Sequence, residues 1–65
     1  MIVLTRLNDR QVVVNAELIK YVEQTPDTLV TLTSGDKLMV KESTEEVVRR
    51  VIEFGRALRV YPRQM

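Results

Sequence analysis

The sequence predicts a mainly β protein, with a five-stranded antiparallel meander or small barrel followed by one C-terminal α-helix. Three observations predict this fold. The first forty-two residues contain five short runs rich in Val, Ile, Thr and Tyr, which suit a pleated sheet. The connections between these runs are only two to four residues long, so successive strands should be antiparallel neighbours. After residue 43 the apolar residues recur at helical spacing. At 65 residues the chain is a single domain, residues 1–65.

The strands are expected where the β-branched and apolar residues gather. Each run is five or six residues long, the commonest strand length. The five ranges are 2–7, 10–14, 18–23, 28–33 and 37–41.

The breaks between the runs have turn chemistry. Asn8-Asp9 can occupy the two central positions of a tight hairpin, because both residue types tolerate positive φ. Residues 15–17 form a short connection. Pro26 has the fixed φ that a turn requires, and Gly35 allows a positive φ.

The last element is a helix over residues 44–58, with a tail at 59–65. Ser43 is a favourable N-cap, and Glu46 three residues later completes a capping box. Pro62 prevents the helix from continuing beyond residue 61. One face is apolar, formed by Val47, Val51, Phe54 and Leu58, with Val48 and Ile52 beside them. On the outer face we expect the i, i+4 ion pairs Glu45–Arg49 and Glu46–Arg50.

Several strands lack the alternation of a sheet with one face in water. Residues 2–4, 12–14 and 38–40 are continuous apolar runs. One helix can cover only one face of a sheet. Either the sheet curls into a small barrel, or a second subunit covers its other face. A chain of this size also has a small core for a solitary domain. We therefore expect a homo-oligomer, in which the helix packs on its own sheet or on a neighbour's.

The composition excludes most catalytic and metal chemistry. The chain has no Cys and no His, so it lacks thiolate nucleophiles, sulfur ligands and imidazole acid–base groups. It has only two glycines, far apart, and so no glycine-rich phosphate loop. We expect a protein that is not an enzyme, with no catalytic residues, no cofactor and no metal.

No targeting or membrane segment is evident. Arg6 interrupts the apolar start after only four residues, which is too soon for a secretory signal. No apolar stretch approaches the ~18 residues needed to cross a bilayer. We expect a cytoplasmic protein without membrane insertion, or one that is peripheral on the cytoplasmic side of a larger structure.

An RNA-binding function is the alternative. The opening Leu4-Thr5-Arg6 and the order of five strands and a helix resemble small dimeric translational regulators of the carbon storage regulator type. The C-terminal quarter is basic, with a candidate patch formed by Arg49, Arg56, Arg59 and Arg63. However, aromatic residues are only 5% of the chain, so bases would find few stacking partners. Residues 1–48 carry five basic and eight acidic residues, which repels phosphate. Nucleic acid is therefore not the expected partner.

A second resemblance covers most of the chain. The sequence resembles the FlbD family, also called SwrD. The matching residues lie over about residues 1–52 and comprise the opening 1–8, Asn15, Leu18-Ile19, 25–28, Thr31-Leu32, Gly35 and 40–43. The family usually has Asn-Gly at the first hairpin, where this chain has Asn8-Asp9, so the type of that turn is open.

The resemblance implies a small bacterial flagellar protein that supports motor power and swarming motility, without an established catalytic site. On this basis the expected partner, besides a second copy of the chain, is a flagellar motor or stator protein on the cytoplasmic side of the basal body. A polar contact patch is expected at the first two turns, formed by Thr5, Arg6, Asn8, Pro26, Asp27 and Thr28. Arg6 is the most informative of these, because a charge in an apolar strand requires an acidic or carbonyl partner.

Overall fold

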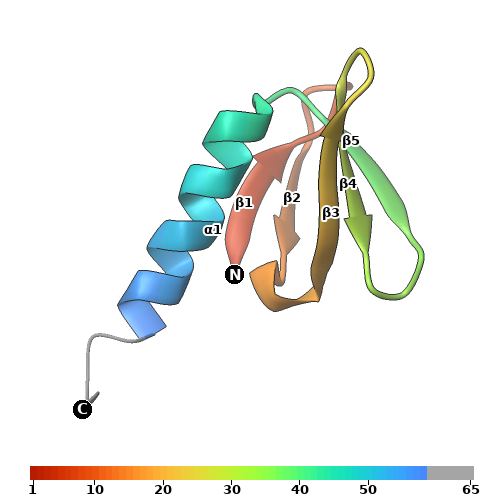
Figure 1. Ribbon diagram of the computed structural model, residues 1–65. Coiled ribbons are helices and arrows are strands. Elements are labelled where there is room, and N and C mark those ends of the chain that lie inside the picture. The colour runs from red at the N-terminus through yellow and green to blue at the C-terminus, as the bar shows by residue number, and fades with distance from the viewer. Residues whose placement is uncertain (59–65) are drawn as a thin grey trace.

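The computed structural model describes residues 1–58 and contains five antiparallel strands and one helix (Figure 1). The strands are β1 (Ile2–Thr5), β2 (Gln11–Val14), β3 (Ile19–Gln24), β4 (Thr28–Leu32) and β5 (Lys37–Val40). A 3₁₀ turn, η1 (Ala16–Leu18), precedes β3, and the helix is α1 (Thr44–Leu58). The prediction of five strands and a C-terminal helix is confirmed, with strand ends shifted by one or two residues. The expected tail, 59–65, lies outside the described residues.

The strands form two sheets instead of one continuous meander or a closed barrel. One sheet pairs β1 with β2, and the other has the order β3-β4-β5. The prediction of a single sheet or barrel is therefore wrong for residues 1–58. The chain between β2 and β3 is coiled into η1, which Asn15 caps by accepting the N–H of Glu17 at 3.0 Å. This coil carries β3 away from β2, so the two strands do not pair.

Within residues 1–58 the backbones of the two sheets pair at one point. Arg6, just beyond β1, forms an isolated bridge with Val40 at the end of β5. Beside it, the N–H of Lys41 donates to the carbonyl of Thr5 at 2.8 Å. Along the same edge of β1, side chains and not a strand bind the backbone: Glu42 accepts the N–H of Thr5, and Arg50 donates to the carbonyl of Val3.

The core lies between the inner faces of the sheets and α1. Alternate residues of the strands point inward, so β1 buries Ile2 and Leu4 but exposes part of Val3. Leu4, Val30, Val40 and Val47 are fully buried. The helix contacts both β1 and β3, and it contributes Val47 and the partly buried Val51 and Phe54. Val48 and Ile52, expected beside this apolar face, are instead exposed.

The β1–β2 and β4–β5 hairpins use the same turn geometry. In each, a four-residue turn is closed by a backbone hydrogen bond of 2.9 Å, from Asp9 to Arg6 and from Gly35 to Leu32. The closing residue has positive φ in both, 70° for Asp9 and 95° for Gly35. The prediction for Gly35 is confirmed. Asn8-Asp9 was expected at the two central positions, but the centre is Leu7-Asn8, because Asp9 takes the position of positive φ.

Gly35→Ala is expected to lower the free energy of unfolding by about 1–2 kcal/mol, because an L-residue with a Cβ is disfavoured at this φ. A Cβ there would meet no atom within 4 Å, so steric conflict with neighbours contributes nothing. Gly35→Asn is the matched control, since Asn tolerates positive φ. Urea unfolding of both variants tests this. Equal losses for Ala and Asn would contradict the conformational explanation.

Candidate functional site

Three connections converge at the end of the molecule where α1 begins. Figure 1 shows the β1–β2 turn, the β3–β4 turn and the β5–α1 connection gathered there. Between them lies a groove of about 480 Å³. Leu7 comes from the first turn, Pro26 and Asp27 from the second, and Lys41 and Ser43 from the third. We call this hollow the turn-end groove.

The predicted contact patch is only partly assembled at this groove. Pro26 and Asp27 line it and are exposed, and Thr28 also lines it but is buried. Asn8 is exposed, and its Oδ1 accepts the N–H of Arg10 at 3.0 Å, which stabilises the turn.

The other two residues of the predicted patch lie elsewhere. The backbone N–H of Thr5 donates to the side chain of Glu42. Arg6 lines a different groove, between the two sheets. It lies beyond the end of β1 and is exposed, so water solvates its charge. Within residues 1–58 Arg6 forms no ion pair, so its expected acidic or carbonyl partner is not found inside the described chain, and its place in the contact patch stays a prediction.

One side of the turn-end groove carries a pair of charges. The ammonium group of Lys41 forms a hydrogen-bonded ion pair with the carboxylate of Asp9. Both side chains are exposed, so the pair contributes little to stability. Its effect is local, because it ties the β1–β2 turn to the β5–α1 connection beside Leu7.

Glu42 joins the outer edge of β1 to the helix. Its two carboxylate oxygens accept the N–H of Thr5 at 2.9 and 3.1 Å, and Oε2 lies 3.3 Å from a guanidinium nitrogen of Arg50. Arg50 also donates to the carbonyl of Val3 at 2.6 Å. Burial raises the pKa of Glu42, but the bonds from Thr5 and its own backbone and the charge of Arg50 outweigh it. The pKa of Glu42 therefore lies below the ordinary glutamate value of 4.5.

The start of α1 differs in detail from the predicted capping box. Ser43 caps the helix, since its Oγ accepts the N–H of Glu46 at 3.1 Å. The Glu46 side chain turns to Arg49 at 2.6 Å and Arg50 at 2.7 Å. These bonds lower the pKa of Glu46 to about 2. The Glu46–Arg50 pair is confirmed, whereas the Glu45–Arg49 pair is wrong because Arg49 binds Glu46 instead.

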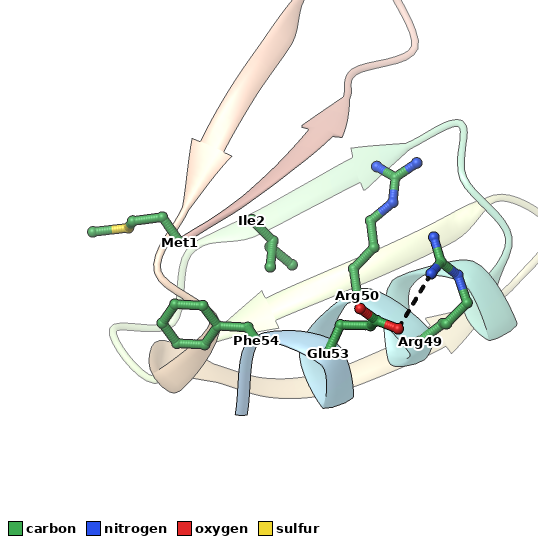
Figure 2. A pocket seen from close by; sticks show the side chains of 6 residues that line it. All are labelled: Met1, Ile2, Arg49, Arg50, Glu53 and Phe54. Carbon is green, nitrogen blue, oxygen red and sulfur yellow. Dashed lines mark ion pairs between the residues drawn. The ribbon is translucent and has the colours of Figure 1, made fainter. Parts of the chain in front are cut away.

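The two described arginines of the candidate basic patch differ: Arg49 is paired with carboxylates, whereas Arg56 forms no ion pair among residues 1–58. Arg49 lies between Glu46 and Glu53, whose carboxylate is 3.9 Å away. Figure 2 shows the Arg49–Glu53 pair at the charged end of a groove of about 360 Å³, with Met1 and Phe54 at its apolar end. Arg56 is exposed, and Arg59 and Arg63 lie outside the described residues.

Sequence reasoning missed the places of Leu7 and Glu42, and the contact that Arg50 makes with β1. Leu7 was assigned to the end of the first strand, although its place next to Asn8-Asp9 is a signal that it belongs to the turn. Two signals could have drawn attention to Glu42. It lies within the stretch 40–43 that carried the family resemblance, and it is an acidic residue directly before the N-cap serine. No local pattern reveals that it reaches Thr5, thirty-seven residues earlier.

Among residues 1–58 no group of three or more Cys, His, Asp or Glu side chains is placed to hold a metal ion. No helix in this range is long and apolar enough to cross a membrane. The features described above define a small β-rich protein with one helix, whose distinctive parts are its surface grooves.

Comparison with known families identifies the chain further. A family model for flagellar and swarming motility proteins, FlbD, matches residues 1–58. The chain belongs to this family, which has a role in flagellar and swarming motility and is not known for enzymes. The match extends past the expected limit at residue 52 to the end of α1. Comparisons with curated proteins and with solved structures each gave no match.

Proposed function

We propose that this protein is a non-enzymatic flagellar accessory protein that supports motor power and swarming by binding a motor or stator component at the turn-end groove. The observation that carries the proposal is the convergence of three connections around an exposed leucine, in a chain of a flagellar motility family. The proposal places the protein on the cytoplasmic side of the flagellar basal body, as a peripheral component.

The groove has the chemistry of a protein-contact site. Leu7 is 43% exposed although it lies in a tight turn, and it has no role in the buried core of residues 1–58. Interfaces gain most of their affinity from a few residues that are buried in well-packed pockets on binding. Around Leu7 the polar side chains of Asp27, Lys41 and Ser43 supply a rim that can form hydrogen bonds. The fitting occupant is an apolar side chain of the partner with polar groups beside it.

Loss of Leu7 is expected to impair motility without unfolding the protein. Leu7→Ser removes about half of the apolar surface that the side chain would bury on binding. This loss weakens binding by roughly tenfold. Swarm expansion in a strain that carries only the variant should fall toward that of the deletion strain. Co-purification of tagged variant with stator and motor proteins should fall in parallel.

Leu18→Ser is the matched control. Leu18 is 47% exposed, nearly as much as Leu7, and it lies in η1 at the opposite end of the molecule (Figure 1). Both variants should melt within a few degrees of the wild type. Normal swarming with Leu7→Ser, or an equal defect with Leu18→Ser, would refute the assignment of the groove.

A further inference from the structure

The helix carries a second apolar stripe that its own sheets do not cover. Val48 is 45% exposed and Ile52 is 53% exposed. Gly55, three residues beyond Ile52, completes the same side of the helix, since residues three and four apart lie on one face. A shallow groove of about 440 Å³ runs along Val48 and Ile52, lined also by Thr44, Glu45 and Arg49. We call the surface of Val48, Ile52 and Gly55 the helix stripe.

Gly55 has no structural purpose within the described chain. A Cβ at this position would meet no neighbouring atom within 4 Å, so alanine would fit. Glycine in a helix interior lowers helix stability relative to alanine. A residue with no side chain is useful where another backbone must approach closely. Gly55 is half-buried and lies on the same side of α1 as Val48 and Ile52, where the absence of a side chain would let the backbone of a second molecule approach.

The charges beside the helix stripe would attract those of a second copy only if the two helices were antiparallel. Glu45 lies near the start of α1 and Arg56 near its end, on the same flank of the stripe at helical spacing. Neither forms an ion pair among residues 1–58. An antiparallel second helix brings Glu45 of each copy to Arg56 of the other, whereas a parallel helix would bring each charge to its like. Antiparallel packing also aligns the helix dipoles favourably.

We propose that the chain forms a two-fold symmetric dimer in which the helix stripes of two copies pack antiparallel. With the axis near residue 50, Val48 of one copy lies against Ile52 of the partner subunit, and Glu45 lies beside Arg56 of the partner subunit. Such a self-complementary patch is what two-fold symmetry requires. The interface is separate from the turn-end groove, so the dimer and the proposed function stand or fall independently.

The oligomeric state tests the proposal. Sedimentation equilibrium of the full chain from 1 to 300 μM should give twice the monomer mass of 7.5 kDa at the higher concentrations. Ile52→Glu should remain at 7.5 kDa across the range, because it replaces an apolar side chain in the contact with a charge that dimerisation would remove from water. Met39→Glu is the matched control, since Met39 is an exposed apolar residue on the outer face of β5, and it should remain dimeric. A wild-type monomer at all concentrations, or a dimer in Ile52→Glu, would overturn the proposal.

Charge reversal tests the antiparallel orientation. Glu45→Arg and Arg56→Glu should each weaken the dimer by about five- to tenfold at low salt, because each places like charges together. The double variant Glu45→Arg/Arg56→Glu should return to within about twofold of the wild type. Failure of the double variant to recover would overturn the antiparallel arrangement. Circular dichroism of each variant confirms that the fold is retained.

Discussion

Glu42→Ala is expected to lower the free energy of unfolding by about 2–3 kcal/mol, because it leaves the N–H of Thr5 without its acceptor and Arg50 without one of its two acidic partners. A chain of this size has a total stability of roughly 5 kcal/mol. The melting temperature should therefore fall by about 10 °C or more. Glu23→Ala, at an exposed position on β3, is the control and should change it by no more than a few degrees.

The same carboxylate gives the fold a defined acid sensitivity. The pKa of Glu42 in the folded chain lies below 4.5, so the unfolded chain binds this proton more readily. Its contribution to stability is complete above about pH 4.5 and is lost as the pH falls through the lower, folded-state pKa. Glu42→Ala should consequently lose less stability than the wild type between pH 6 and pH 3. Parallel pH profiles for the two proteins would show that Glu42 does not have this role.

Leu4→Ala should have the largest effect on stability. The Leu4 side chain is fully buried between the two sheets and α1, and truncations of such leucines cost about 2–5 kcal/mol. That range approaches the whole stability expected for 65 residues. The variant should be largely unfolded at 37 °C, seen as loss of the far-ultraviolet dichroism of α1.

Val13→Ala provides the comparison within the same sheet. Val13 is 63% exposed on β2 and points away from the core, so its truncation should cost under about 0.5 kcal/mol. A large loss for Val13→Ala would show that a second molecule buries the outer face of this sheet. A small loss for Leu4→Ala would contradict the position of the core.

Local sequence patterns predicted the elements but not how they pair. The short connections and β-branched runs located all five strands, and the helical period with Ser43 located α1. The split into two sheets was not predictable in this way. The coil of η1 separates β2 from β3, and no β-strand pattern marks it in advance. At the edge of β1 the contacts of Glu42 and Arg50 span 37 and 47 residues, which local patterns do not reveal.

In the candidate site, too, local sequence patterns predicted some residues and not others. Pro26 and Asp27 could be recognised as turn residues, and they do line the turn-end groove. Arg6 was singled out as a charge within a strand, but β1 ends one residue before it. Val48 and Ile52 are exposed because of the way α1 is rotated against β1 and β3. The sequence period did not determine this rotation, because the helix is apolar on more than one side.

The side chains along β1 have a consequence for solubility in the crowded cell. An uncovered strand edge is a template on which further chains can add and grow into aggregates. Here Glu42 takes up the N–H of Thr5, and Arg50 takes up the carbonyl of Val3. The N–H of Thr5 and the carbonyl of Val3 therefore cannot form hydrogen bonds with an incoming strand. Desolvating the charges of Glu42 and Arg50 at this edge of β1 would also cost free energy. Glu42 and Arg50 thus disfavour strand-by-strand polymerisation through this edge of β1, which is separate from the two surfaces proposed for association.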